Sequence, residues 1–224
     1  MINLDSHRRY IQIAFNGDLS QVRAILPRIP NDPRIIIEAG TPFIKLEGMR
    51  GVNFIRRHWR GLLLADLKLT DGAFSETMIA VKAGANAVTV LGSAPVDTLN
   101  LFCKFCRENG VYAVIDMLGV TNPLRKMMPL RFKPHVVVIH KGRDEEENPR
   151  SIIRYKDITK VRSKFDTLIS VAGGLVVDKV KESYFNGADI AIINVVSPQD
   201  RNKGLRVDDD IEKAIQIALA EAGN

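Results

Sequence analysis

Short apolar runs alternate along the chain with longer stretches in which apolar residues recur at helical spacing. The short runs are rich in Leu and β-branched residues, and several are apolar almost throughout, which is typical of strands buried on both faces. They predict eight strands, over residues 10–15, 34–38, 61–66, 87–91, 111–116, 135–139, 167–171 and 189–193. The stretches between and after them predict helices over residues 20–26, 73–83, 96–108, 151–164, 176–186 and 209–221.

This alternation favours the α/β class and a (β/α)8 TIM barrel, as one domain over residues 1–224. Dividing 224 residues among eight units gives about 28 per unit, near the lower end for this architecture. No linker, repeat or low-complexity segment divides the chain. An open doubly wound sheet is the main alternative, but it needs a glycine fingerprint after the first strand, where this chain has only Gly17.

Composition indicates an ordinary globular protein, with 46% hydrophobic and 26% charged residues. Two cysteines do not make a disulfide scaffold, which favours a reducing compartment. No segment approaches the roughly 18 uninterrupted apolar residues of a membrane span, and the first residues lack the apolar stretch of a secretory signal. We therefore expect a cytoplasmic protein without membrane contact.

The net charge of +6 is compatible with a nucleic-acid partner or with a site for a phosphorylated metabolite. Aromatic residues are few, at 6%, and no basic stripe recurs at regular spacing. Charge therefore favours a small phosphorylated ligand and no nucleic acid.

Polar residues and glycines cluster where the predicted strands end, which is the functional face of a TIM barrel. The strongest unit is Asp66-x-Lys68-x-x-Asp71, because residues i and i+2 of an extended segment point the same way. A lysine held between carboxylates can donate a proton or stabilise a developing anion, although the spacing fits a plain salt bridge equally well. Glu38 ends the neighbouring predicted strand. Its carboxylate and that of Asp66 would repel each other unless a cation neutralises them, and that cation could be Mg²⁺ or the Lys68 ammonium alone.

Other strand ends carry residues with both a functional and a structural interpretation. Asp116 ends the fifth predicted strand. His140 follows the sixth and could be an acid, a base or a hydroxyl ligand, although a lone histidine is more often structural. Gly173-Gly174 precedes a predicted helix and could let a phosphate approach backbone N–H groups, but a tight turn fits equally.

Three segments receive structural interpretations. Cys103-x-x-Cys106 lies inside a predicted helix without a second cysteine pair, which favours buried packing over a zinc site. The basic segment 56–60 is expected to be a solvated connector before the third strand. The acidic segment 144–147 is expected to be an exposed loop.

A series of motifs, in order over nearly the whole chain, resembles the orotidine 5'-phosphate decarboxylase suprafamily. Within it, the chain is most similar to the group of hexulose-6-phosphate synthases and 3-keto-L-gulonate-6-phosphate decarboxylases. The most specific motifs are Glu-Ala-Gly-Thr-Pro at 38–42 and Asp-x-Lys-x-x-Asp at 66–71. The full set covers residues 37–42, 45–49, 65–71, 88–92, 115–120, 172–174 and 187–190.

The resemblance implies a homodimer of barrels, with active sites near the interface and a sugar phosphate as substrate. It implies that Glu38 and Asp66 hold Mg²⁺, that Lys68 steadies an enediolate, and that Asp71 extends toward the partner subunit's site. Reactions in this group pass through a metal-stabilised enediolate. The function expected first is a Mg²⁺-dependent lyase with hexulose-6-phosphate synthase-like aldol chemistry, which joins formaldehyde and ribulose 5-phosphate or reverses that reaction.

Two motifs differ on the type of lyase. Residues 116–120 look more like the synthase, whereas His140-x-x-Arg143 looks more like the decarboxylase, in which an arginine at that position helps to protonate the intermediate. A 3-keto-L-gulonate-6-phosphate decarboxylase is therefore the second candidate. An orotidine 5'-phosphate decarboxylase is a weaker one, because nucleotide decarboxylases do not need a metal-type residue such as Glu38.

Three positions depart from the family pattern. Asn16 replaces the usual aspartate and cannot serve as a base. Asn194-Val195 replaces a Gly-Arg pair that binds the phosphate. Lys141 replaces the usual residue after the histidine and could supply the missing charge. A non-catalytic barrel with a different ligand is thus the third candidate. The expected catalytic residues are Asp66, Lys68, Asp71, Asp116 and His140, and the expected substrate-binding residues are Asn16, Glu38, Arg143, Gly173, Gly174 and Asn194.

Overall fold

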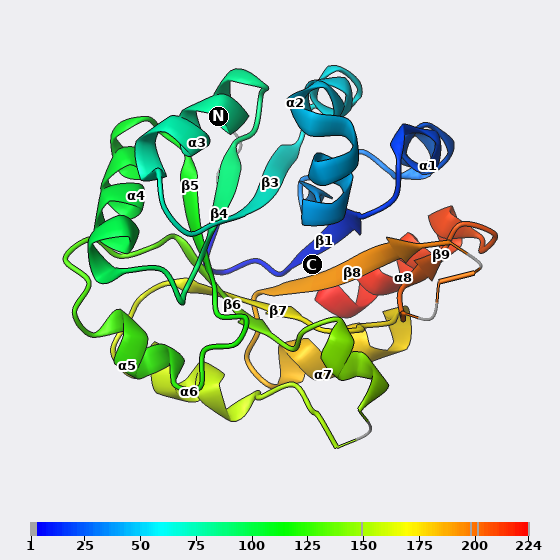
Figure 1. Cartoon of the computed structure of the whole chain (residues 1–224). Helices are drawn as coiled ribbons and strands as arrows, with labels where there is room; N and C mark the ends of the chain where they lie inside the picture. Colours follow the sequence, from blue (N-terminus) through cyan, green and yellow to red (C-terminus); the bar gives the residue numbers. More distant parts are fainter. Residues whose placement is uncertain (1–3, 149, 198, 201, 224) are drawn as a thin grey trace.

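Eight parallel strands pair in chain order, and β1 also pairs with β8, so the sheet closes into a barrel (Figure 1). The computed structural model describes residues 4–148, 150–197, 199–200 and 202–223. The strands are β1 (Tyr10–Phe15), β2 (Ile35–Ala39), β3 (Leu62–Leu69), β4 (Ala87–Leu91), β5 (Tyr112–Asp116), β6 (Val136–His140), β7 (Leu168–Ala172) and β8 (Ile190–Val196). A short β9 (Leu205–Arg206) pairs with the end of β8. The predicted (β/α)8 TIM barrel is confirmed.

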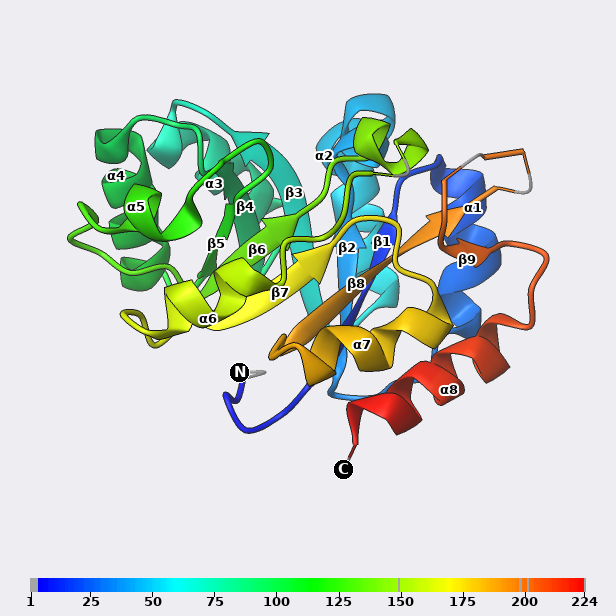
Figure 2. The same ribbon diagram turned by 90° about the horizontal axis from the view of Figure 1, so that it is seen from below.

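Helices follow the strands and surround the barrel (Figure 2). The α-helices are α1 (Leu19–Ile25), α2 (Thr41–His58), α3 (Ala73–Lys82), α4 (Val96–Glu108), α5 (Pro123–Met127), α6 (Lys156–Arg162), α7 (Val180–Phe185) and α8 (Ile211–Ala222). Three 3₁₀ turns add η1 (Leu26–Arg28), η2 (Asp144–Glu147) and η3 (Val177–Lys179). No described helix is both long enough and apolar enough to cross a membrane.

The core has two layers because successive strand residues face opposite sides of the sheet. Between sheet and helices lies the larger layer, which includes Ile11, Ile13, Ile37 and Leu63. Inside the barrel, apolar side chains fill the N-terminal and middle parts, and they include Tyr10, Ala14, Ile36, Leu62, Leu64, Val114, Val136, Val138, Ile190 and Ile192. The same inward-facing rows become polar toward the C-terminal ends of the strands, which leaves a polar mouth above an apolar floor.

The predicted strands are confirmed, with most ends within one residue, but β3 and β8 run longer than expected. β3 continues to Leu69 through a register shift after Ala65, where Lys68 adopts a left-handed φ of 46°. The backbone N–H of Lys68 donates to the Thr89 hydroxyl at 3.0 Å, which compensates the interrupted ladder. β8 continues to Val196 because its end pairs with β9.

The expectation for the basic segment 56–60 is wrong, because most of it is the end of α2. Gly48, with φ 60°, kinks this helix and interrupts its apolar periodicity, which hid it from the pattern. Trp59 is buried, and Arg56 donates to the Gly61 carbonyl at 3.1 Å. The segment therefore anchors the start of β3.

Two predicted helices are shorter than expected. The prediction over 151–164 is wrong for its first residues, because only Lys156–Arg162 is helical. Arg154 instead donates to the carbonyls of Val120 and Thr121. These hydrogen bonds hold residues 151–155 in a non-helical conformation. The prediction over 176–186 resolves into η3 and α7.

The remaining structural expectations concern the cysteines and the acidic segment. Cys103 and Cys106 are free and buried in α4, which confirms the packing interpretation. The acidic segment 144–147 is mostly exposed, as expected, but forms η2 beside the barrel mouth.

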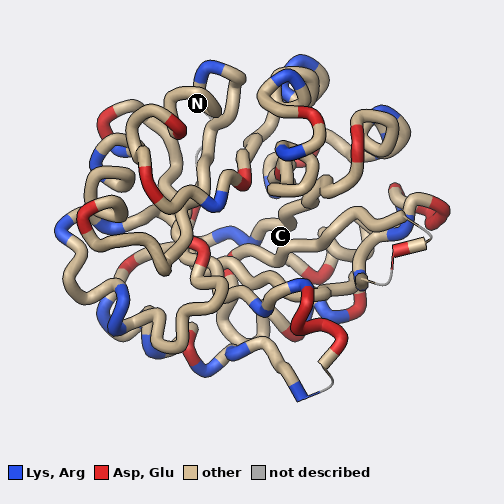
Figure 3. The backbone as a smooth tube through the Cα atoms, in the orientation of Figure 1, with Lys and Arg blue, Asp and Glu red and all other residues tan. Residues whose placement is uncertain are grey.

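Figure 3 shows that basic and acidic residues are interspersed along the whole backbone.

Candidate active site

A cavity of about 520 Å³ opens at the C-terminal ends of the strands. Its lining includes most of the side chains that the sequence predicted, namely Asn16, Glu38, Asp66, Lys68, Asp116, His140, Arg143, Gly173 and Asn194. The inward alternation of the strands brings these distant residues together. Two predicted residues, Asp71 and Gly174, do not line this cavity.

Lys68 stands between two carboxylates from different strands. Its Nζ lies 2.7 Å from Asp116 Oδ2 and 3.0 Å from Asp66 Oδ2. Burial alone would lower the pKa of Lys68, but the charges of Asp66 and Asp116 outweigh it and raise that pKa well above its ordinary value. The cavity therefore contains a fixed ammonium group at neutral pH, which can stabilise negative charge that develops on a substrate.

Asp116 connects Lys68 to His140. His140 Nδ1 lies 2.9 Å from both carboxylate oxygens, and the Leu118 backbone N–H donates to Oδ1 at 3.0 Å. Burial opposes ionisation of Asp116, but His140 and Lys68 outweigh it and hold its pKa far below the usual range. Asp116 is thus a permanent anion that fixes both cationic partners.

His140 is poised to carry a proton. Burial would lower its pKa, but the charge and hydrogen bond of Asp116 prevail and raise it. Because Nδ1 faces Asp116, Nε2 is the nitrogen left for a ligand. This arrangement suits a general acid and base at the cavity wall.

Glu38 and Asp66 face the same cavity with different environments. Burial, with the nearby charge of Asp66, raises the pKa of Glu38 to about 7. Gln12 Nε2 donates to Glu38 Oε2. Among the described residues no group of three or more His, Cys, Asp or Glu could hold a metal, so these two carboxylates would need water or substrate oxygens to complete a cation site.

Three polar side chains that donate hydrogen bonds to Glu38 or Asp66 were missed by the sequence reasoning. Thr41 Oγ1 donates to Asp66 Oδ2 at 2.8 Å, and Thr89 Oγ1 donates to Asp66 Oδ1 at 2.7 Å. Gln12, the third, is 4% exposed inside the barrel. A polar residue on the inward row of an otherwise apolar strand is the signal that could have identified Gln12 and Thr89.

Asn16 and Asn194 bond to each other across the β1–β8 seam. Asn16 Nδ2 donates to Asn194 Oδ1 at 3.0 Å. Val195, at the position of the family's arginine, is 1% exposed and points into the packing. This end of the cavity therefore has an amide in place of the family's aspartate and a buried valine in place of its arginine.

The glycine pair has two different surroundings. Gly173, with φ 131°, lines the cavity, and a Cβ there would lie 2.5 Å from Lys141 Cβ. Gly174 faces the carboxylate of Glu146, since its Cβ would lie 2.7 Å from Glu146 Oε2. The pair is followed by η3 and a helix of six residues. Gly173 is thus required by a close backbone approach, and Gly174 contacts an internal anion.

Two other predicted residues differ in position. Arg143 is half-buried and lines the cavity, and it has no acidic partner among the residues that the structure describes. Asp71 is exposed on the loop between β3 and α3. Within this one chain Asp71 is separate from the Lys68 cluster, so a role for it at a partner's site stays a prediction.

Comparisons with known proteins agree with this architecture. The model of the orotidine 5'-phosphate decarboxylase / HUMPS family matches residues 7–194. A bifunctional enzyme Fae/Hps of Methanothrix thermoacetophila is 36% identical over 186 residues, which are 82% of this chain and 47% of that protein. The chain thus spans about half the length of the curated relatives it matches.

Solved structures extend the likeness to nearly the whole chain. The 3-hexulose-6-phosphate synthase of Salmonella typhimurium has a TM-score of 0.76 and 25% identity, and covers 95% of this chain and 99% of its own. A 3-keto-L-gulonate-6-phosphate decarboxylase of Vibrio cholerae, at 21% identity and a TM-score of 0.71, covers 96% and 97% and shares the fold. By the family match and the sequence relatives, the chain belongs to the orotidine 5'-phosphate decarboxylase / HUMPS family.

Proposed function

We propose that this barrel is a lyase that joins formaldehyde to ribulose 5-phosphate, in either direction, as a 3-hexulose-6-phosphate synthase does. The observation that carries the proposal is the Lys68 ammonium held between Asp66 and Asp116, beside His140. The names of the Fae/Hps relatives and of the structural neighbours at 25% identity support the same reaction.

The proposed reaction needs charge stabilisation and proton transfer. A proton leaves C1 of ribulose 5-phosphate, and its electron pair is shared with the C2 oxygen as an enediolate. C1 then attacks formaldehyde, and the new alkoxide takes up a proton. Lys68 supplies a fixed positive charge next to the enediolate, and His140 exchanges a proton through Nε2 while Asp116 holds its ring.

Glu38 and Asp66 fit a Mg²⁺ site. Both are oxygen donors in one cavity, and a cation bound there would offset the burial and the Asp66 charge that raise the pKa of Glu38. Bound Mg²⁺ would act as a Lewis acid toward the two oxygens of the ketose. The two carboxylates would hold the ion, with Thr41 and Thr89 orienting Asp66.

The test is formaldehyde-dependent consumption of ribulose 5-phosphate by the purified chain with Mg²⁺, and formaldehyde release in the reverse direction. We expect turnover in both directions. No turnover in either direction by folded protein would reject this reaction.

A keto-sugar-acid phosphate decarboxylase is the second candidate, favoured by Arg143 in the cavity wall. This reaction also passes through an enediolate, formed by loss of carbon dioxide. Release of carbon dioxide from 3-keto-L-gulonate 6-phosphate, without formaldehyde chemistry, would select it over the aldol reaction. Failure of both reactions, with metal-independent binding of an unphosphorylated sugar, would select the non-catalytic barrel.

Mg²⁺ binding is expected to release protons below neutral pH. Glu38, with a pKa of about 7, is largely protonated at pH 6 and must ionise to bind a cation. We expect the Mg²⁺ affinity to rise by about tenfold between pH 6 and pH 8, with up to about one proton released at pH 6. Calorimetry in two buffers of different ionisation enthalpy measures both quantities. A pH-independent affinity, or unchanged binding by Glu38→Gln, would contradict the assignment.

A homodimer remains part of the proposal. Large apolar side chains are exposed near Asp71: Phe74 on α3 is 63% exposed and packs edge-on against Phe105 of α4, where Leu101 is 61% exposed. Exposed apolar side chains of this kind mark an interaction surface, and they would place Asp71 close to a partner barrel. Sedimentation analysis should give twice the chain mass of 24.9 kDa, and a monomer would contradict it.

A cytoplasmic location is also proposed. Both cysteines are free thiols, as expected in a reducing compartment. Fractionation of cells of the source organism measures the location, and recovery outside the cytoplasm would contradict it.

A further inference from the structure

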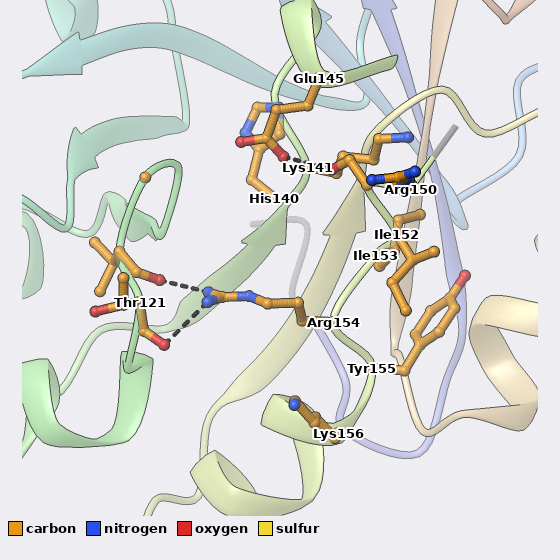
Figure 4. A pocket seen from close by; sticks show the side chains of 13 residues that line it. Thr121, His140, Lys141, Glu145, Arg150, Ile152, Ile153, Arg154, Tyr155 and Lys156 are labelled. Carbon is orange, nitrogen blue, oxygen red and sulfur yellow. Dashed lines mark hydrogen bonds between the residues drawn. The ribbon is translucent and has the colours of Figure 1, made fainter. Parts of the chain in front are cut away.

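A second cavity, of about 670 Å³, lies beside the active-site cavity (Figure 4). Its walls come from the loop after β5 (119–121), the end of β6 with the following residues, and the segment 150–156 before α6. His140 and Glu145 line both cavities, so the two are adjacent along the His140 side chain. A ligand that reacts beside Lys68 could therefore extend past His140 into this space.

The second cavity has an excess of unpaired positive charge. Lys141, Arg150 and Lys156 line it, and none has an acidic partner in the part of the chain that the structure describes. Lys141 is half-buried, and Figure 4 draws Lys141 and Arg150 at the end of the cavity where His140 and Glu145 also lie. The carboxylate of Glu145 accepts from the Ser151 hydroxyl at 3.0 Å.

Arg154 has a structural role in the same wall. It donates to the backbone carbonyls of Val120 and Thr121 and pairs with Asp157 at 3.3 Å. This residue braces the 119–121 loop against the 150–156 segment, as the dashed lines in Figure 4 show. The cavity is thus built by fixed contacts, while Lys141 and Arg150 remain available for a ligand.

The opposite end of the active-site cavity is unfavourable for an anion. The carboxylate of Glu146 lies against Gly174 and accepts from the Lys203 backbone N–H at 3.3 Å. The Asn194 side-chain oxygen is already bonded to Asn16. A phosphate placed there would meet the negative charge of Glu146, and the buried Val195 supplies no cation in place of the family's arginine.

We propose that the phosphate of the substrate binds in the second cavity, to Lys141 and Arg150, and not between the ends of β7 and β8. Arg150 offers a bidentate fork, and Lys141 a compact ammonium, to the three acceptor oxygens of a phosphomonoester. The reacting carbons lie beside Lys68, and the carbon chain passes His140. This inference rests on the proposed sugar-phosphate substrate and identifies how its phosphate is recognised.

The test compares binding by the double variant Lys141→Met/Arg150→Gln with binding by the native chain. Calorimetry measures the dissociation constants of inorganic phosphate and of ribulose 5-phosphate, and assays measure KM and kcat. We expect both dissociation constants and KM to rise at least about tenfold, with kcat changed much less. The matched control is Arg60→Gln/Lys164→Met, which removes the same charges from exposed positions beside the N-terminal ends of β3 and β7.

Several results would overturn the inference. One is unchanged binding of ribulose 5-phosphate by the double variant, and another is an equal loss in the control. A third is weakened binding of inorganic phosphate with an unchanged KM, which would mean that the cavity holds an anion other than the substrate's phosphate. Tightening of phosphate binding by Glu146→Gln, with no effect of the double variant, would place the phosphate at Gly174 instead.

Binding and turnover separate this inference from the proposed reaction. If the native chain binds ribulose 5-phosphate through Lys141 and Arg150 but does not consume it with formaldehyde, the reaction is wrong and the phosphate site stands. If turnover occurs and the double variant behaves as the native chain, the reaction stands and the phosphate site is wrong.

Discussion

Lys68→Met is expected to lower kcat by about a thousandfold. The ammonium is the fixed cation held by both Asp66 and Asp116, and removal of one preorganised stabilising group typically costs a factor of 10² to 10³. The variant also leaves two buried carboxylates, Asp66 at 6% and Asp116 at 2% exposure, without their shared partner. Loss of a partner from a buried pair costs about 3 kcal/mol or more, so the melting temperature should fall as well. Steady-state kinetics and thermal unfolding measure the two effects.

Two further variants separate charge from geometry at this position. Lys68→Arg keeps the positive charge, so it should recover much of the stability but little activity, because a planar fork cannot occupy the place of a compact ammonium. Lys164→Met, the same replacement as Lys68→Met at an exposed position, should change neither quantity. Near-native turnover by Lys68→Met would contradict the role of Lys68.

Asp116→Asn is expected to lower kcat at least about a hundredfold and to lower the pKa of His140. Burial opposes the charged imidazole, and the Asp116 charge and hydrogen bond are what raise its pKa. Without that charge, burial prevails and the ring is neutral at the pH where the native ring carries a proton. An NMR titration of the His140 ring nitrogens measures the shift directly.

The pH dependence of stability should change in the same variant. A histidine whose pKa is raised by folding contributes stability that is fully present below its unfolded pKa, about 6.5, and is lost as pH rises through the folded pKa. Asp116→Asn should remove this contribution of His140. The control Asp144→Asn changes the same charge at an exposed position of the cavity rim, and should leave the His140 titration in place. An unchanged titration in Asp116→Asn would contradict the coupling.

The strands were predictable because burial on both faces produces nearly continuous apolar runs. The 18-residue α2 was not, because Gly48 and Gly51 interrupt its apolar stripe and its last turn is basic. The segment 151–155 carries a helical pattern but is held out of a helix by hydrogen bonds of Arg154 to a distant loop. Local pattern cannot report a contact of that kind.

The site was predictable to the extent that it lies at strand ends. Asp66, Lys68, Asp116 and His140 meet because the alternation of each strand directs them inward and closure of the barrel brings β3, β5 and β6 to one mouth. The hydroxyl groups of Thr41 and Thr89, which donate to Asp66, were not predicted from the sequence. Their hydrogen-bond partners depend on the strand register and on the first turn of α2. The position of the Glu146 carboxylate beside Gly174 likewise depends on the path of η2. From the sequence, this segment could be predicted only to be acidic and exposed.

The central claim is that this cavity forms and stabilises an enediolate on a ketose phosphate. Proton NMR of ribulose 5-phosphate with the chain in deuterium oxide, without formaldehyde, tests it most directly, because it detects exchange of the C1 proton before any carbon–carbon bond is made. We expect one of the two C1 proton signals to disappear, at a rate that depends on the native chain and is lost in Lys68→Met. Retention of both C1 protons in the presence of folded native chain, saturated with ribulose 5-phosphate and Mg²⁺, would contradict the account.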